Sequence, residues 1–293
     1  MLFNSISYAF FLPIVVIIYW SLNCFRLKYQ NYFLIFVSYF FYGLWDYRFL
    51  FLVVISSTAD FLLSQKLQHT ENDKKRKILL LISIVINLGI LFMFKYLGFF
   101  VESFADLLFQ FGLKPNLPSL KFILPVGISF YTFQTLSYTI DVYKKKIEAC
   151  SDPVVFFAFV CFFPQLVAGP IERAKTFLVQ FSNKRLFCIN DAKDGSRLIL
   201  WGLFKKTVIA DNLSPFVEMA FGGNPDLGGL DLLIGAVCFS IQIYCDFSGY
   251  TDIAIGSAKL LGFSLSKNFA NPYFSRNLIE FWQRWHISLS TWF

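Results

Sequence analysis

The last thirteen residues of the chain place a histidine and an arginine between tryptophans. They read Phe-Trp-Gln-Arg-Trp-His-Ile-Ser-Leu-Ser-Thr-Trp-Phe over residues 281–293, and His286 is one of two histidines in the sequence. A neutral imidazole can take a proton from a hydroxyl group and return it, and apolar surroundings keep it neutral near pH 7. The pattern therefore predicts a catalytic base at His286. The competing interpretation is an interfacial anchor among tryptophans.

If this tail is one helix, its polar side chains form two adjacent stripes. One stripe carries Gln283, His286 and Ser290, and the other carries Arg284, Ser288 and Thr291. In such a helix Trp285 stacks over Leu289, and Glu280 has the i, i+4 spacing of an ion pair with Arg284. The tail is therefore expected to be amphipathic, lying at a membrane interface or dipping inward.

An apolar stretch near the middle of the chain carries a second polar stripe. Tyr131, Gln134, Tyr138 and Asp141 recur at helical spacing, beside three threonines at 132, 135 and 139. Polar groups inside apolar runs are costly and are functional candidates. The stripe predicts either the wall of a polar tunnel, which suits Gln134 and Tyr138, or hydrogen bonds between helices, which suit the threonines.

Two aspartates mark a third polar region. Gln242 and Asp246 are four residues apart and share a helical face, and Phe-Ser-Gly-Tyr at 247–250 is expected to break or kink the helix before Asp252. A carboxylate here should be paired or line water, which favours a functional role for Asp246. Asp252 is interpreted as a helix cap.

The elements that position these groups are predicted to be membrane helices. The sequence is 56% hydrophobic and 15% charged, whereas soluble domains carry roughly 25% charged residues. Apolar runs near the length of a bilayer span, about 20 residues, recur throughout. Their continuous apolar character argues against a transmembrane barrel. The fold class is therefore all-α, a polytopic helical membrane bundle forming a single domain over residues 1–293.

About eight spans are expected, and the basic residues between them set an orientation. Spans are predicted near 5–22, 31–42, 49–64, 78–96, 122–143, 198–221 and 230–244, with a last apolar stretch at 253–265. Lys66, the basic run 74–77 and the lysines 144–146 indicate cytoplasmic loops, which puts the N-terminus outside. Residues 154–168 are too short and too interrupted for a span and are predicted to be re-entrant. A turn with interfacial aromatics is predicted at 43–47, and residues 97–113 are expected to lie along the outer interface.

Several function classes are disfavoured. The net charge of +7 is explained by loop topology, so no nucleic-acid partner is expected. The six cysteines contain no C-x-x-C pair and there are only two histidines, so no metal site is expected, and His69 lies in a charged loop. The sequence lacks a G-x-S-x-G elbow, a Walker loop and a G-x-G-x-x-G motif.

Four blocks and the Met-Leu-Phe-Asn-Ser opening resemble the membrane-bound O-acyltransferases, and within them the alginate O-acetyltransferase branch. The blocks are LPVGISFYTFQ at 124–134, FFPQLVAGPI at 162–171, QIYCDFSGY at 242–250 and the tail from 281 to 292. The resemblance covers essentially the whole chain. It implies a helical ring around a tunnel in a bacterial inner membrane, with His286 on the family's essential tryptophan-histidine motif. A second family histidine would lie beyond residue 293, so the resemblance implies an N-terminal fragment, inactive by itself.

The resemblance also implies a reaction. Acetyl-CoA would be the cytoplasmic donor, no cofactor would be bound, and the acetyl group would reach an extracytoplasmic polysaccharide or a partner acetyltransferase. His286 would act as general base or transient acyl acceptor, while Arg284 and Gln134 would orient the donor or stabilise developing charge. The candidates for lining the tunnel or binding the donor are Gln134, Tyr138, Asp246, Arg284, Trp285 and Ser288.

Three alternatives stay open at this stage. A secondary transporter would share broken helices and polar groups at mid-membrane. The related branch that exports D-alanyl groups to teichoic acid would use similar chemistry on another donor. A membrane scaffold would have no chemistry at all.

Overall fold

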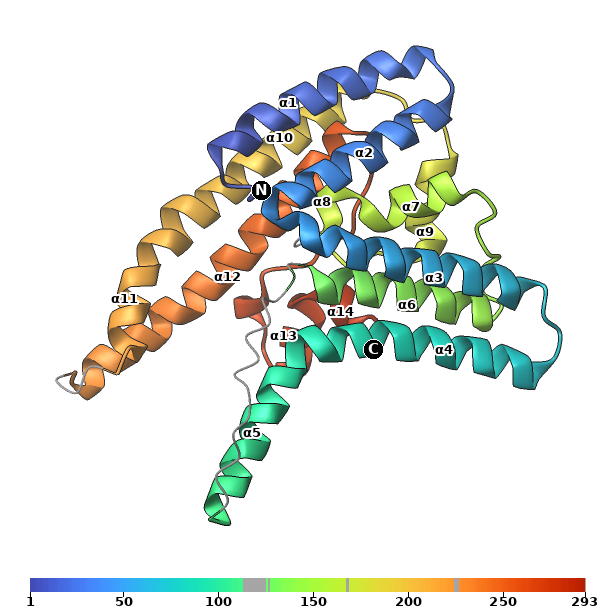
Figure 1. Cartoon of the computed structure of the whole chain (residues 1–293). Coiled ribbons are helices and arrows are strands. Elements are labelled where there is room, and N and C mark those ends of the chain that lie inside the picture. The colour runs from blue at the N-terminus through green and yellow to red at the C-terminus, as the bar shows by residue number, and fades with distance from the viewer. Residues whose placement is uncertain (113–124, 126, 167–168, 224–226, 293) are drawn as a thin grey trace.

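The computed structural model describes residues 1–112, 125, 127–166, 169–223 and 227–292, and every regular element among them is a helix (Figure 1). The first half comprises α1 (Ile6–Ser21), η1 (Leu22–Cys24), α2 (Leu27–Asp46), η2 (Tyr47–Phe49), α3 (Leu50–Gln68), α4 (Asp73–Leu91), η3 (Phe92–Tyr96), α5 (Leu97–Gln110) and α6 (Ile128–Tyr143). The second half comprises α7 (Pro153–Cys161), α8 (Phe163–Leu166), α9 (Ala174–Ser182), α10 (Ile189–Leu203), η4 (Phe204–Ala210), α11 (Asp211–Phe221), α12 (Gly229–Leu260), η5 (Pro272–Phe274), α13 (Leu278–Arg284) and α14 (Ile287–Ser290). Helices satisfy their own backbone hydrogen bonds, which a lipid environment requires.

Four helical runs among the described residues are long and apolar enough to cross a membrane. They are Ile6–Cys24, Leu27–Gln68, Asp73–Gln110 and Gly229–Leu260. The second run contains two of the predicted spans, and the prediction for 122–143 begins outside the described residues. Large apolar side chains face outward, as Phe10 and Ile17 do with about 70% of their surface exposed. The chain is therefore a multi-pass membrane protein, as predicted.

The turn between α2 and α3 lies a few residues later than predicted. Residues 43–46 continue α2, and the chain turns at Tyr47–Phe49. Asp46 fixes this position because its carboxylate accepts hydrogen bonds from the backbone and the guanidinium of Arg48. The acidic side chain, and not Gly43, ends the helix.

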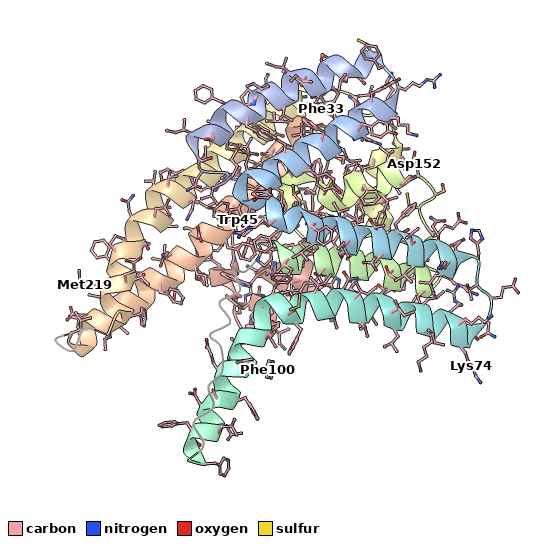
Figure 2. The ribbon with its side chains drawn as sticks, viewed as in Figure 1. Phe33, Trp45, Lys74, Phe100, Asp152 and Met219 are labelled. Carbon is pink, nitrogen blue, oxygen red and sulfur yellow. The ribbon has the colours of Figure 1, made fainter. Side chains whose placement is uncertain are left out.

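Both predicted basic loops lie at one end of the bundle. The guanidinium of Arg76 donates to Leu67 O at 2.6 Å and to Tyr143 O at 2.7 Å, which joins the α3–α4 turn to the end of α6. In Figure 2, Lys74 lies on this side and Trp45 lies toward the other. The shared side agrees with the expectation that one orientation serves both loops.

The predicted re-entrant segment consists of two short buried helices. α7 ends at Cys161, and the backbone turns at Phe162 before α8. The amide of Phe163 donates to Ser38 Oγ on α2 at 3.1 Å, so a protein side chain satisfies the interrupted backbone. Residues 167 and 168 lie outside the described residues, and the direction in which this segment meets the membrane stays a prediction.

Of the break or kink predicted at 247–250, the break is wrong, because α12 is continuous from Gly229 to Leu260. Gly249 serves close packing instead. A Cβ on Gly249 would lie 2.8 Å from Gly202 O, and one on Gly202 would lie 2.5 Å from Gly249 O. The glycine therefore allows α10 and α12 to pack backbone against backbone, and Figure 1 shows α11 and α12 extending together from the body.

A π-helical turn separates α4 from α5. This turn, η3, joins the two helices into the single run Asp73–Gln110, and α5 points away from the body in Figure 1. No residue of α5 is buried. Single π-helical turns often occur at functional sites, and this one brings Lys95 to the candidate site.

Candidate active site

The tail that carries His286 is not one helix. α13 ends at Arg284, His286 adopts the left-handed conformation with φ 47°, and α14 begins at Ile287. The predicted stripe of Gln283, His286 and Ser290 is therefore wrong. The left-handed residue turns the imidazole away from the line of α13. The predicted ion pair between Glu280 and Arg284 is confirmed.

Asn268 holds the tail in this turn. Its side-chain oxygen accepts hydrogen bonds from Ser288 N at 3.1 Å and Ser288 Oγ at 2.8 Å, and its backbone oxygen accepts from Ile287 N at 3.0 Å. Ser288 Oγ in turn accepts from Ile171 N at 3.0 Å. The hydroxyl of Ser288 is thus occupied, and it positions the histidine without reaching the cavity described next.

His286 is half-buried between aromatic rings. Its ring centroid lies 4.9 Å from that of Phe247 and 6.5 Å from that of Phe130. Nε2 is buried and has no hydrogen-bond partner among the described residues. Burial lowers the pKa of His286 below its ordinary value, because the charged imidazolium loses solvent. The residue is therefore a neutral base with a free nitrogen.

His286 is one of the residues that line a cavity of about 190 Å³, called the His286 cavity below. It is lined by Leu91, Lys95, Tyr96, Ser129, Phe130, Phe133, Ile171, His286 and Leu289. The Lys95 ammonium lies 3.4 Å from Ser129 Oγ. The cavity is mostly apolar and holds one cation and one neutral base.

A second hollow, called the basic hollow below, lies farther along α6. Its volume is about 350 Å³, and Ser137, Ile140, Asp141, Lys144, Lys146, Arg173, Thr291 and Trp292 line it. Trp292 packs on Phe133 of the His286 cavity, with ring centroids 5.0 Å apart, and its Nε1 donates to Phe133 O. One face of α6 therefore runs from the first hollow to the second, with this aromatic pair between them.

Gln134 and Tyr138 have their polar groups occupied by neighbouring helices. Gln134 donates to Phe159 O at 2.9 Å and exchanges hydrogen bonds with Gln165. The Tyr138 oxygen accepts from Ser64 Oγ and from Cys150 N. This geometry favours hydrogen bonding between segments over a tunnel wall.

Arg284 and Trp285 lie outside both hollows. Arg284 is paired with Glu280. Trp285 packs against Phe269 and Phe281, with centroids 5.1 Å and 5.6 Å apart, so the predicted stacking on Leu289 is replaced by an aromatic cluster. The left-handed turn at His286 separates this cluster from α14.

The two aspartates of α12 are paired with lysines of η4. Lys205 Nζ lies 2.7 Å from Asp252 Oδ2, and Lys206 Nζ lies 2.6 Å from Asp246 Oδ1. Lys205 also donates to Ser248 Oγ at 2.9 Å. The interpretation of Asp252 as a helix cap is wrong, because α12 continues past it. The expected pairing of Asp246 is present.

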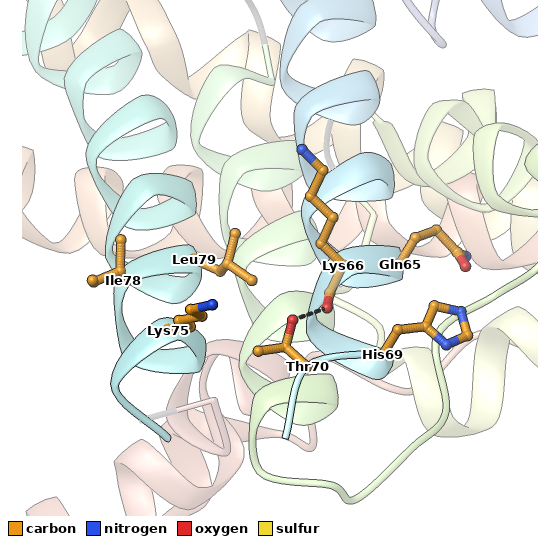
Figure 3. A pocket seen from close by; sticks show the side chains of 7 residues that line it. All are labelled: Gln65, Lys66, His69, Thr70, Lys75, Ile78 and Leu79. Atoms are coloured by element: carbon orange, nitrogen blue, oxygen red, sulfur yellow. Dashed lines mark hydrogen bonds between the residues drawn. The ribbon is translucent and has the colours of Figure 1, made fainter. Parts of the chain in front are cut away.

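The other large hollow near histidine is at the α3–α4 turn. It measures about 520 Å³, and its polar lining includes Lys66, His69 and Lys75. Figure 3 shows the His69 imidazole pointing away from Lys75, while Thr70 Oγ1 donates to Lys66 O. No residue of the tail lines this hollow.

Three features were missed by the sequence analysis. Lys95 carried a signal, since a lysine inside an apolar run is costly unless it has a function. Asn268 carried no signal, because its hydrogen bonds to Ser288 depend on a tertiary contact. Lys205 and Lys206 were not assigned as the partners of the aspartates.

Comparison with known proteins identifies relatives whose names describe acyl transfer to cell-surface polymers. The model of the membrane-bound O-acyltransferase family matches residues 143–293. The probable alginate O-acetylase of Pseudomonas aeruginosa is 37% identical over 295 residues, covering all of this chain and 55% of that protein. The peptidoglycan O-acetyltransferase of Helicobacter pylori is 33% identical over 99% of this chain and 60% of its own length. The teichoic acid D-alanyltransferase of Bacillus subtilis is 29% identical over 61% of this chain and 46% of its own length. The chain thus spans little more than half the length of the first two relatives.

Proposed function

This chain belongs to the membrane-bound O-acyltransferase family, and we propose that its full-length protein transfers acetyl groups for O-acetylation of an extracytoplasmic polysaccharide. The observation that carries the proposal is the neutral imidazole of His286. It is held by a left-handed turn, and its buried Nε2 lacks a partner beside an apolar cavity. The names of two relatives, which act on alginate and peptidoglycan, support the class of reaction.

The proposed step is transfer from a thioester to a hydroxyl. His286 Nε2 takes the hydroxyl proton as the oxygen attacks the carbonyl carbon, and a tetrahedral oxyanion forms. When that intermediate collapses, the carbon–sulfur bond breaks and the imidazolium returns the proton to the thiolate. The products are an ester and a free thiol. The variant in which His286 itself carries the acyl group uses the same nitrogen.

The donor is proposed to be acetyl-CoA, which needs no bound cofactor. Its phosphates would meet the basic hollow, where Lys144, Lys146 and Arg173 outnumber Asp141. Arg173 is partly engaged, since it donates to Thr291 O at 2.6 Å. The basic end of the bundle supports an inner-membrane protein with this face in the cytoplasm and the N-terminus outside. The acceptor is proposed to be a cell-surface polymer or a partner acetyltransferase.

The test compares the two histidines in the full-length protein. His286→Ala should lower acetyl transfer from labelled acetyl-CoA in membrane vesicles by about 10²- to 10⁴-fold, with unchanged membrane insertion. His69→Ala, the matched control at the exposed α3–α4 turn, should transfer normally. Wild-type transfer by an inserted His286→Ala protein would overturn the assignment.

The D-alanyl alternative rests on the Bacillus relative and has the same geometry. It differs in donor, so vesicles supplied with a D-alanyl carrier protein in place of acetyl-CoA separate the two. The transporter alternative loses one of its supports, because α12 is continuous, although the interrupted α7–α8 segment remains.

A further inference from the structure

Lys95 stands apart from the other lysines that lie among the helices. It sits in the π-helical turn η3, inside the run Asp73–Gln110, and its side chain lines the His286 cavity. Lys205 and Lys206 each have an aspartate within 2.8 Å. The ion pairs of the described residues include no carboxylate for Lys95. A cation at membrane depth without a counter-ion marks a functional position.

The contacts of Lys95 leave its charge available. Its nitrogen lies 3.4 Å from Ser129 Oγ, at the limit of a hydrogen bond, and 5.5 Å from the ring centroid of Tyr96. A hydroxyl and an aromatic face stabilise an ammonium without neutralising it. The charge can therefore serve a group that enters the cavity.

The first turn of α6 adds to the positive potential at the same place. Ser129 and Phe130, the second and third residues of this 16-residue helix, line the His286 cavity. A helix N-terminus carries about half a positive charge, because its first N–H groups lack partners within the helix. His286 is neutral, so Lys95 and this helix end decide the sign of the cavity. Lys95 is itself an exposed side chain, so its charge acts most strongly once a bound molecule displaces water from it.

We propose that Lys95 is a second catalytic residue, whose ammonium donates a hydrogen bond to the thioester carbonyl oxygen while His286 moves the proton. This inference rests on the proposed acyl transfer. The carbonyl oxygen gains negative charge when the hydroxyl attacks and loses it when the carbon–sulfur bond breaks, so the lysine stays protonated throughout. A preformed donor aimed at such an oxygen is commonly the largest single contribution to acyl transfer.

The experiment uses the full-length protein in vesicles with labelled acetyl-CoA. Lys95→Met keeps the length of the side chain and removes the charge. It should lower kcat by about 10²- to 10³-fold, with a much smaller change in KM for the donor. Lys95→Arg should recover part of the loss. Lys66→Met, which changes an equally exposed lysine near the end of α3 that does not line the His286 cavity, should behave as wild type.

A chemical rescue separates charge from folding. Lys95→Cys, purified and then alkylated with bromoethylamine, regains an ammonium of nearly the same reach in a protein that has already folded. The alkylated variant should recover most of the transfer, measured against wild type treated in the same way because the chain has six native cysteines. Failure of this rescue in an inserted, His286-dependent protein would overturn the assignment.

The outcomes distinguish this inference from the proposed function. If Lys95→Met transfers within threefold of wild type while His286→Ala is inactive, Lys95 is only an interfacial anchor and acyl transfer at His286 stands. If neither change affects transfer, the proposed function itself fails.

Discussion

Two groups of polar side chains in this bundle differ in how many of their hydrogen bonds and ion pairs are formed within the protein. The Asp60 network, defined as Ser56, Asp60, Ser83, Asn87 and Thr135, joins α3, α4 and α6. Asp60 accepts from Ser83 Oγ at 2.5 Å and Asn87 Nδ2 at 2.8 Å, and Asn87 Oδ1 accepts from Ser56 and Thr135. All five are almost fully buried. In the His286 cavity, by contrast, the buried imidazole nitrogen has no hydrogen-bond partner, and the exposed Lys95 has no ion pair, among the residues that the structure describes.

The difference separates stability from reactivity. A buried polar group that is fully hydrogen-bonded costs little and fixes helix packing. One left without a partner keeps its desolvation cost, and it persists where an incoming molecule supplies the missing partner. The Lys205–Asp252 pair belongs with the Asp60 network, since both charges are met within the protein.

Removing one partner of the Lys205–Asp252 ion pair should have the largest effect on stability. Lys205→Met leaves Asp252 without its ion-pair partner and should lower the free energy of unfolding by about 3 kcal/mol. Thermal unfolding in detergent measures the loss. The double change Lys205→Met with Asp252→Leu should recover most of it. A single variant as stable as wild type would contradict the structural role of the pair.

Opening the Asp60 network should have the next largest effect. Asp60→Ala removes the acceptor of Ser83 Oγ and one of the two acceptors of Asn87 Nδ2, which keeps its bond to Ser83 O; the change should cost about 2 kcal/mol. Transfer per correctly folded molecule should stay near wild type, because none of these side chains lines the His286 cavity. Lost transfer at unchanged thermal stability would place Asp60 in the chemistry and erase the contrast.

The pH dependence of transfer tests the other side of the comparison. The base acts as neutral imidazole, and burial lowers the pKa of His286, so the ring stays neutral in more acidic solution. The midpoint of the acid limb in a plot of kcat/KM against pH should therefore lie below about 6.5, the ordinary pKa of histidine. Phe247→Ala hydrates the ring, raises its pKa and should move that limb to higher pH. An acid limb unmoved by this change would show that packing on Phe247 does not set the titration.

Glu172 is intermediate between the two groups, because it has hydrogen-bond donors but no ion-pair partner among the described residues. Its substitution should have the smallest effect on stability. It is buried, and its carboxylate accepts from Ser266 N at 2.5 Å and Ser266 Oγ at 2.8 Å. Burial raises its pKa, so the fold favours the protonated form and loses stability as pH rises through the titration. Glu172→Gln keeps the acceptor without the charge. It should raise Tm by about 1–3 °C at neutral pH, with the gain vanishing in acid. A gain that persisted in acid would contradict the titration of Glu172.

Composition and apolar run length were sufficient to predict the helical membrane fold, because lipid leaves few other solutions. Local spacing also predicted the pair of Glu280 with Arg284. The break at Gly249 was wrong, since a glycine can serve a turn or a close approach and only the facing helix decides between them. The facing residue is Gly202, far away in sequence.

The candidate site was predictable at His286 and less so around it. Helical periodicity in the tail failed because the side chain of Asn268, twenty residues away in sequence, holds Ser288 and stabilises the left-handed turn. Gln134 fitted the pattern of a tunnel wall, but its side-chain amide is hydrogen-bonded to Gln165 and to Phe159 O, which lie on other segments. The sequence shows Lys95 as a lone charge in an apolar run. Its functional role could be proposed only from the cavity that it lines together with His286.

The close contact of α10 and η4 with α12 has a consequence for biogenesis. An isolated lysine or aspartate at the centre of a helix opposes insertion by about 2.5–3.5 kcal/mol. Lys205 pairs with Asp252 and Lys206 with Asp246 across this hairpin, and Asp211 is a second carboxylate beside Lys206. We expect the two arms to leave the translocon together, with these ion pairs formed and Gly202 already packed against Gly249.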